Sequence, residues 1–138
     1  MDELDLLELN LEKRHGDFHL SIRVEMGAEW LVLLAPSGGG KSLLLNLISG
    51  VVQPDAGRVR LGGETLFDKE RGIRLPIRKR QIGYLFQDYA LFPHLSVSQN
   101  IAYGVPRGRH SGEEVKKWLR FFELEQQAHA YPRHLSGG

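Results

Sequence analysis

The chain has 138 residues, of which 41% are hydrophobic and 25% charged, so it is long enough for one domain with an apolar core. Eighteen basic and 17 acidic residues give a formal net charge of +1, which excludes a protein that binds nucleic acid mainly by electrostatic attraction. There is no cysteine, so disulfide bonds and thiolate metal sites are also excluded. Residues 1–5 are acidic where a signal peptide would be basic, and no apolar run approaches the roughly 18 residues of a membrane helix. We therefore expect any role at a membrane to be peripheral.

Two runs of alternating apolar and polar residues open the chain, at 7–12 and 18–24. A period of two is typical of strands with one buried face. The intervening Arg14–Asp17 segment contains glycine and predicts a hairpin turn. We therefore expect an antiparallel β layer at the start of the fold.

Residues 30–34 are apolar without alternation, which predicts a strand covered on both faces. A glycine loop follows at once, and an apolar helix is predicted over 42–49, ending at Gly50. Strand, glycine loop and helix together form one unit of a nucleotide-binding α/β fold.

The middle of the chain predicts a second hairpin, with 58–61 and 64–67 joined by Gly62–Gly63. Residues 68–80 are charged, and we interpret them as a surface loop. A further strand is predicted over 82–86, ending just before Gln87.

Beyond Pro93 the pattern becomes helical. Ser96 is a candidate cap for a helix to about Tyr103, and a capping box at Ser111 starts another to about Glu123. The second helix is expected to present one apolar face, made of Val115, Trp118, Leu119 and Phe122. We predict a nucleotide-binding α/β core with its antiparallel layer over residues 1–93, and a helical subdomain over 94–138.

The segment from Ala35 to Ser42 differs from the P-loop pattern G-x-x-x-x-G-K-[ST] only at its first position. Its glycines let backbone N–H groups point at phosphate oxygens, and a helix N-terminus adds partial positive charge. Lys41 is expected to reach the β- and γ-phosphates, and the Ser42 hydroxyl to ligate Mg²⁺. Alanine is tolerated at position 35 if its φ is negative, which we expect. The predicted nucleotide-binding residues here are Ala35, Pro36, Ser37, Gly38, Gly39, Gly40, Lys41, Ser42 and Leu43.

Two further motifs complete a resemblance to ABC-transporter nucleotide-binding subunits along the whole chain. Residues 84–94, Tyr-Leu-Phe-Gln-Asp-Tyr-Ala-Leu-Phe-Pro-His, resemble the family's Q-loop, and residues 135–138 match the start of its LSGGQ signature. Gln87 lies 46 residues after Lys41, and Leu135 lies 48 after Gln87, which is similar to the family's spacing. The resemblance implies a P-loop NTPase core of the ABC type, with an N-terminal antiparallel β layer and a small helical subdomain.

The resemblance also implies roles for residues outside the P-loop. Gln87 would bring its amide oxygen to Mg²⁺ and the attacking water, and its loop would contact an integral membrane permease. Ser136, Gly137 and Gly138 would close over the γ-phosphate held by a second ATPase subunit in a head-to-tail homodimer.

Three other residues bear on the same site. An aromatic ring of the first hairpin would stack on adenine, and His15 is the candidate. Phe18 is the second choice, although its alternation with Leu20 favours a core side chain. Leu43 stands where many relatives carry Ser or Thr, which leaves only its backbone N–H for a phosphate.

The family's later apolar run ending in Asp-Glu, the Walker B strand, does not occur in these 138 residues. We therefore expect an N-terminal fragment that ends in the signature, with the C-terminal part of the fold missing. Alone it is expected to be marginally stable, to bind nucleotide at best weakly and to hydrolyse ATP negligibly. The intact subunit would be an Mg²⁺-dependent transport ATPase at the cytoplasmic face of the cell membrane.

Residues 87–104 resemble those of importers of oxyanions and small solutes, and 63–80 with the short first hairpin resemble molybdate or tungstate importer subunits most. Sulfate, iron and polyamine importers share much of this pattern. His94 is expected to line the groove for the permease's coupling helix, whereas the basic Arg74, Arg78, Lys79 and Arg80 are interpreted as part of a solvated loop.

Three other classes of protein share some of these features. A DNA-repair ABC ATPase is disfavoured because no coiled coil or zinc module separates Gln87 from Leu135. A dinucleotide-binding dehydrogenase is disfavoured because no G-x-G-x-x-G follows a strand. A truncated, non-catalytic nucleotide-binding module remains an alternative.

Overall fold

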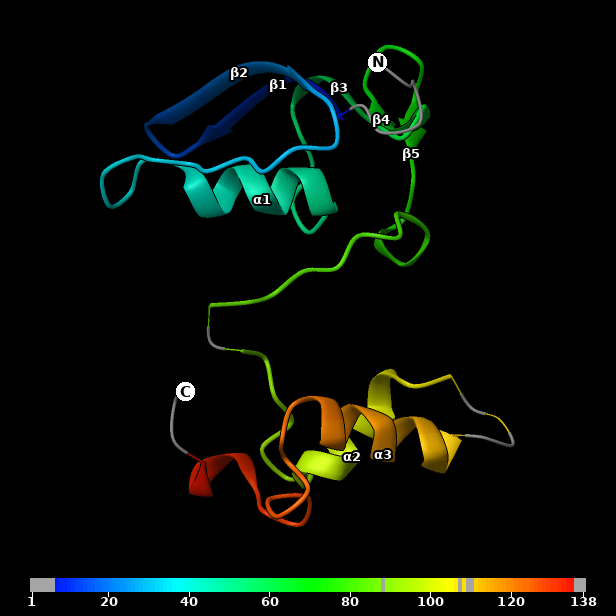
Figure 1. Ribbon diagram of the computed structural model, residues 1–138. Coiled ribbons are helices and arrows are strands. Elements are labelled where there is room, and N and C mark those ends of the chain that lie inside the picture. The colour runs from blue at the N-terminus through cyan, green and yellow to red at the C-terminus, as the bar shows by residue number, and fades with distance from the viewer. Residues whose placement is uncertain (1–6, 88, 107, 109–110, 136–138) are drawn as a thin grey trace. The chain divides into compact units, whose positions relative to one another are not determined.

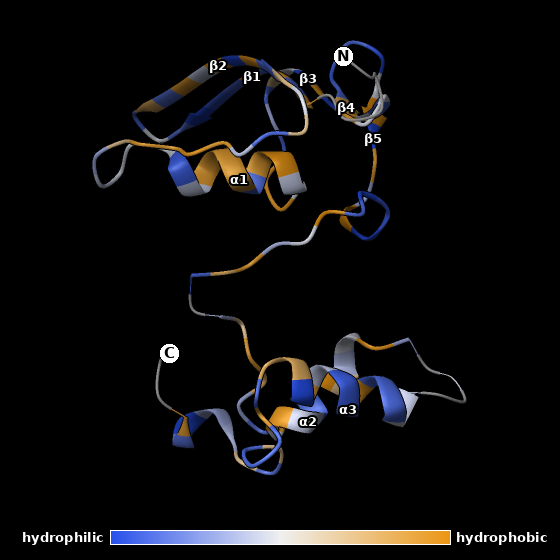
Figure 2. Ribbon diagram, viewed as in Figure 1, coloured by the Kyte–Doolittle hydropathy of each residue, from blue (hydrophilic) through white to orange (hydrophobic). Residues whose placement is uncertain are grey.

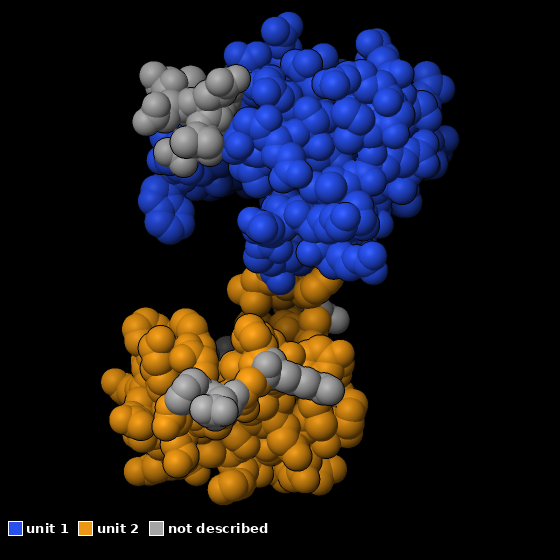
Figure 3. Space-filling view, turned by 90° about the vertical axis from the view of Figure 1, so that its right-hand side faces the viewer, with its two compact units in different colours: residues 1–84 blue, residues 85–138 orange. Residues whose placement is uncertain are grey.

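The computed structural model describes residues 7–87, 89–106, 108 and 111–135. The chain divides into two compact units, residues 1–84 and 85–138, coloured blue and orange in Figure 3. We predict the boundary between the nucleotide-binding core and the helical subdomain after residue 93. The division into compact units does not test this boundary, which stays a prediction.

The first unit contains a five-stranded sheet in the order β2-β1-β3-β4-β5, in which every neighbouring pair is antiparallel. Its strands are β1 (Leu7–His15), β2 (Phe18–Met26), β3 (Ala56–Leu61), β4 (Glu64–Asp68) and β5 (Ile73–Arg74). Both hairpins predicted from the sequence are present, the first closed at Gly16 with φ 59°. The predicted antiparallel layer is therefore confirmed.

Helix α1 (Lys41–Ser49) lies alongside the β1–β2 hairpin in Figure 1, and its surface is mostly hydrophobic in Figure 2. Gly50 ends it as predicted, with φ 87° and its N–H bonded to Asn46 O. The buried core joins helix and sheet, and consists of Leu9, Leu11, Leu44, Leu47, Val59, Leu66 and Phe67. A fully buried leucine contributes roughly 2 kcal/mol, so this layer is the main source of stability in the unit.

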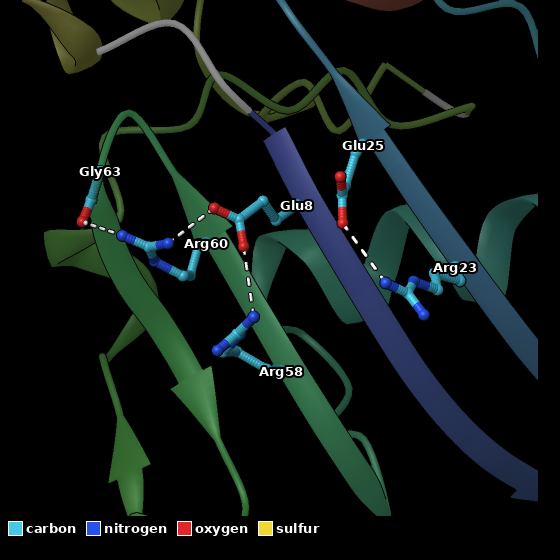
Figure 4. A network of polar contacts seen from close by, with 6 residues as sticks. All are labelled: Glu8, Arg23, Glu25, Arg58, Arg60 and Gly63. Carbon is cyan, nitrogen blue, oxygen red and sulfur yellow. Dashed lines mark hydrogen bonds and ion pairs between the residues drawn. The ribbon is translucent and has the colours of Figure 1, made fainter. Parts of the chain in front are cut away.

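Strands β1, β2 and β3 also carry charged side chains that pair with one another (Figure 4). The Glu8 carboxylate accepts from Arg60 Nη1 at 2.6 Å and from Arg58 Nη2 at 3.3 Å, linking β1 to β3. Arg60 also donates to the carbonyl of Gly63, at 3.3 Å. Partly exposed pairs of this kind contribute at most about 1 kcal/mol each, so they add little to the stability of the sheet.

Two predicted strands, 30–34 and 82–86, are absent from the structure, and both predictions are wrong. Within the described residues neither segment forms a backbone ladder. Trp30 is 99% exposed and Leu34 is 90% exposed, and only Leu33 and Ile82 pack against the core. An apolar run becomes a strand only where another segment offers its backbone as a partner.

The charged segment 68–80 is more ordered than the predicted surface loop. It contains β5 and a short 3₁₀ helix, η2 (Ile77–Lys79). Arg74, Arg78 and Lys79 are exposed, as expected, but Arg80 is only 4% exposed, so its assignment to a solvated loop is wrong. Its side chain is buried because it donates to backbone carbonyls at the end of α1.

The second unit contains α2 (Val97–Gly104), α3 (Ser111–Phe121) and the 3₁₀ helix η3 (Pro132–His134). The predicted cap of α2 is confirmed, since Ser96 and Gln99 exchange both bonds of a capping box. Helix α3 ends at Phe121 rather than near Glu123. Of its predicted apolar face, Leu119 is buried, Val115 half-buried, and Trp118 and Phe122 remain exposed.

Asn100 organises the segment that precedes α2. Its side-chain oxygen accepts from the Phe92 N–H at 2.9 Å, and its amide nitrogen lies 3.0 Å from the carbonyls of Leu95 and Ser96. One amide side chain thus fixes the turn that carries His94. No helix in the described part of the chain is both long and apolar enough to span a bilayer.

We predict that Asp55 links stability to pH. Its carboxylate accepts from Lys13 Nζ at 2.7 Å and from the Arg14 N–H at 2.8 Å, and these bonds lower its pKa below the ordinary value. Because the folded-state pKa is the lower one, the stabilisation is present above about pH 4 and is lost as pH falls through the folded-state pKa. Asp55→Asn should unfold at lower denaturant at pH 7, and the difference from the native protein should shrink below pH 4.

Urea denaturation at a series of pH values measures this effect. Glu70→Gln is the matched control, because the exposed Glu70 side chain forms no hydrogen bond with the described residues. An Asp55→Asn deficit that stayed constant down to pH 2 would contradict the linkage.

Candidate phosphate-binding site

The predicted phosphate loop forms a tight turn ahead of α1. The Gly39 N–H donates to the Pro36 carbonyl at 3.0 Å, and Gly38 and Gly40 have φ of 78° and 82°. Ala35 is not among the residues with positive φ, which agrees with the expectation that alanine is tolerated there. The backbone therefore adopts the compact curve that the glycine pattern predicts.

Packing also demands glycine at two positions of this loop. A Cβ added to Gly39 would lie 2.7 Å from the Ala35 Cβ and 3.0 Å from the Pro36 carbonyl oxygen. At Gly40 it would lie 2.9 Å from two ring atoms of Phe18. The loop is thus closed by backbone and by one aromatic ring.

Lys41 folds back over the loop instead of extending into solvent. Its ammonium group donates to the carbonyls of Ala35, at 2.5 Å, and Pro36, at 3.0 Å. A phosphate oxygen carries a formal negative charge and is a stronger acceptor than an amide carbonyl. The ammonium group is therefore held where an anionic group in the loop would exchange with these carbonyls.

The N-terminus of α1 supplies donors without competition. Gly40 caps the helix without a side-chain bond, and its first turn contains no acidic residue. Among the described residues, no acceptor bonds to the amides of Ser42 and Leu43. Such a terminus carries partial positive charge and favours an anion. The loop, Lys41 and the helix together fit the phosphate tail of a nucleotide.

The residues present also fit a magnesium ion that shares the nucleotide's oxygens. The described part of the chain holds no cluster of three or more His, Cys, Asp or Glu side chains able to bind a metal by themselves. Mg²⁺ at phosphate sites needs few protein ligands, because phosphates and waters supply the rest. Ser42 is exposed in the first turn of α1, so its hydroxyl is accessible for this role.

The remaining sequence-predicted residues are distributed differently. His15, exposed at the end of β1, is not placed against the loop by any contact, whereas the Phe18 ring lies beside Gly40. Phe18 is 37% exposed and lies outside the core, so its interpretation as a core side chain is wrong. The Leu43 side chain, in contrast, packs against the core.

The two other motifs lie apart from the loop in the chain. Gln87 is exposed in a turn of the second unit, closed by the Tyr89 N–H on the Phe86 carbonyl at 3.0 Å. Ser136, Gly137 and Gly138 lie outside the described residues. Their roles at the site therefore stay predictions.

The sequence did not predict the contacts that Asn46, Arg80 and Tyr84 make with distant parts of the chain. The Tyr84 hydroxyl donates to Asn46 Oδ1 at 2.7 Å, and Arg80 Nη1 donates to the Ile48 carbonyl at 2.7 Å. No local pattern could have found these contacts, because more than thirty residues separate the partners.

The comparisons with known proteins agree with this geometry. The model of the ABC transporter family matches residues 18–138. The molybdate/tungstate import ATP-binding protein WtpC of Archaeoglobus fulgidus is 45% identical over 138 residues, covering 96% of this chain and 53% of its own length. The molybdenum import ATP-binding protein ModC of Vibrio cholerae is 44% identical over 131 residues, covering 94% of this chain and 35% of its own. The chain thus spans about half or less of the length of these two relatives.

Two solved structures share the fold. The ATP-binding cassette MJ0796, in a dimeric post-hydrolysis state with ADP and Pi, superposes with a TM-score of 0.69 at 25% identity, over 96% of this chain and 63% of its own. The cassette MJ1267 superposes with a TM-score of 0.73 at 22% identity, over 96% of this chain and 60% of its own. The α/β fold class predicted from the sequence is confirmed.

We predict that Gly40→Ala damages both the loop and its binding capacity. The added methyl group meets the Phe18 ring at 2.9 Å, and a left-handed backbone costs a non-glycine residue about 1–2 kcal/mol. The variant should melt several degrees lower and lose phosphate or nucleotide affinity, measured by thermal denaturation and calorimetry. Gly112→Ala in α3 is the control, since a Cβ there meets nothing within 4 Å and helices favour alanine. Equal affinity in Gly40→Ala and the native protein would contradict the role of this position.

Proposed function

The chain belongs to the ABC transporter family, and we propose that it is the nucleotide-binding part of an importer's ATPase subunit. The observation that carries this proposal is the phosphate loop with its folded-back Lys41. It is followed by the N-terminus of α1, whose first amides bond to no acceptor among the described residues. In this subunit ATP binding and hydrolysis drive solute uptake.

In the proposed site each residue has one task. Backbone N–H groups of residues 38–43 bind phosphate oxygens, and Lys41 neutralises the charge of the β- and γ-phosphates. The Ser42 hydroxyl holds Mg²⁺, which supplies Lewis-acid stabilisation of the phosphate charge when bound. Gln87 orients the attacking water with its amide oxygen. A ring of the first hairpin, His15 or the better placed Phe18, stacks on the adenine.

Hydrolysis needs a carboxylate to polarise the water, and no apolar run ending in Asp-Glu follows the loop within these 138 residues. We therefore propose that the 138 residues bind ATP and turn it over negligibly by themselves. The ATPase activity belongs to the intact subunit. A non-catalytic nucleotide-binding module is the alternative that a turnover measurement separates.

We also propose two protein partners at the cytoplasmic face of the cell membrane. A second ATPase subunit in a head-to-tail homodimer presents Ser136, Gly137 and Gly138 to the γ-phosphate, as a helix N-terminus accepts an anion. The dimeric state of the MJ0796 cassette supports this arrangement. An integral permease contacts the segment around Gln87, with exposed His94 in the receiving groove. No nucleic acid partner is proposed.

Molybdate or a related oxyanion is the proposed cargo. The names of the WtpC and ModC relatives support it. The alternative of another solute has support from a probable sulfate/thiosulfate import ATP-binding protein of Chlorella vulgaris, 37% identical over 142 residues and 98% of this chain. The ATPase subunit does not contact the cargo, so its residues carry no direct specificity.

We predict that Lys41→Ala weakens ATP binding by about tenfold to a hundredfold, because a charge-assisted hydrogen bond contributes about 1.5–3 kcal/mol. AMP binding should change little, since the ammonium group is expected at the outer phosphates. Calorimetric titration with ATP, ADP and AMP, with and without Mg²⁺, measures the effect. Lys117→Ala is the matched control, because Lys117 lies on the exposed surface of α3, where it contacts only Glu114 and the Trp118 ring among the described residues. Native affinity for ATP in Lys41→Ala would refute the site.

A cellular experiment tests the transport function. We expect Lys41→Ala in the intact gene to abolish ATP-dependent molybdate uptake, because nucleotide binding drives transport. Uptake of radiolabelled molybdate is compared with uptake of sulfate, iron and polyamine. If uptake of sulfate, iron or polyamine were lost while molybdate uptake stayed intact, the affected solute would be the cargo in place of molybdate. No change in any uptake, together with ATP binding and no turnover, would favour the non-catalytic module.

A further inference from the structure

The segment that leads to Gln87 is fastened to α1 by two side chains. The first is Tyr84, whose hydroxyl donates to the side-chain oxygen of Asn46 at 2.7 Å. Asn46 lies in the second half of α1, and its own carbonyl accepts the N–H groups of Gly50 and Val52, both at 3.0 Å. Tyr84 therefore holds a residue that itself closes the C-terminus of the helix.

The second is Arg80, which reaches the same end of α1 from the other end of this short segment. Its Nη1 donates to the carbonyl of Ile48 at 2.7 Å, and its Nε donates to the carbonyl of Leu75 at 2.9 Å. A Cβ on Gly50 would lie 2.5 Å from the Arg80 Cζ, so the glycine leaves room for the guanidinium. Burial lowers the pKa of Arg80, yet a guanidinium remains protonated and complements the negative end of the helix dipole. We call Arg80, Tyr84 and Asn46 the clasp.

Arg80 and Tyr84 of the clasp lie in a segment without regular secondary structure, so side-chain contacts matter more for its position. Within the described residues, 80–84 forms no backbone ladder, and Gln81 has a positive φ of 52°. The side-chain hydrogen bonds of the clasp tie this segment to α1, and Ile82 packs against the core. Helix α1 carries the phosphate loop at its other end, and a hydrogen-bonded helix of nine residues acts as a rigid unit.

We propose that Arg80 and Tyr84 are positioning residues, which fix the lead-in to Gln87 on the helix that carries the phosphate loop. Gln87 follows Tyr84 after only Leu85 and Phe86, so anchoring Tyr84 limits the range of the Gln87 segment. The inference rests on the proposed nucleotide-binding function and assigns new roles to two residues outside the phosphate loop. Occupancy of the loop is then transmitted to residues 85–95 through α1 and the clasp.

Hydrogen exchange read by mass spectrometry tests the proposal on the native protein and Tyr84→Phe, with and without Mg-ATP. In the native protein ATP should slow exchange both in residues 35–45 and in residues 85–95. In Tyr84→Phe the slowing at 35–45 and the ATP affinity should persist. Exchange at 85–95 with ATP should be about threefold to tenfold faster than in the native protein, the effect of one lost hydrogen bond.

Three comparisons separate positioning from mere stabilisation. Tyr103→Phe is the matched control, since the exposed Tyr103 hydroxyl forms no hydrogen bond with the described residues, and it should behave as native. Asn46→Ala combined with Tyr84→Phe should add nothing to the single substitutions at 85–95, because both remove the same bond. Arg80→Lys keeps the charge but loses the forked contact, and should also release 85–95.

The outcomes distinguish this inference from the proposed function. Native exchange at 85–95 in Tyr84→Phe, with ATP bound, would overturn the clasp and leave nucleotide binding intact. The clasp would also be overturned if ATP slowed hydrogen exchange only in residues 35–45 of the native protein. A uniform loss of protection and of melting temperature across the first unit would show a structural role alone and would also overturn positioning. Failure of the native protein to bind ATP would overturn the proposed function itself.

Discussion

The packing of α1 on the antiparallel sheet is the constraint on which both ends of the site depend. Leu44 and Leu47 are buried in one cluster with Leu9, Leu11 and Val59, and this packing holds the helix on the sheet. Its N-terminus receives the phosphate loop, and its C-terminus receives Arg80 and Tyr84. The energy comes from apolar burial, because a few buried leucines outweigh the partly exposed ion pairs around Glu8.

The beginning of α1 has features that a purely structural helix avoids. It has no side-chain cap and no acidic residue in its first turn. Two glycines of the preceding loop, Gly38 and Gly40, have a left-handed backbone. The cap of α2 shows the contrast, since Ser96 and Gln99 form a capping box and the first α2 amides bond to the carbonyls of Ala128 and Ala130. An anion would supply the missing acceptors at α1, so nucleotide binding should stabilise the first unit. The same comparison argues against an anion site at α2.

Segments without a strand partner are held in this protein by side chains that bond to backbone. Asn100 fixes the turn before α2, and Arg80 fixes the C-terminal carbonyls of α1. Such contacts are directional and few, so a single substitution can release a segment while the core remains intact. This suits regions that respond to a ligand or a partner, as we propose for the segment around Gln87. It also explains why substitutions there are expected to change exchange and coupling more than stability.

The amino-acid sequence was sufficient to predict the two hairpins, α1 with its terminal Gly50, the capped α2 and the phosphate loop, and three motifs in register indicated the family. Each of these follows from contacts between neighbours in the chain or from backbone limits at glycine, which local patterns record. Other features depend on contacts between distant segments: 30–34 and 82–86 do not form strands, Arg80 is buried, and Phe18 rather than His15 lies beside the loop. An apolar run shows that a segment prefers to be covered, but not which distant segment covers it. Arg80 and Tyr84 find partners more than thirty residues away, and that choice depends on how α1 packs on the sheet.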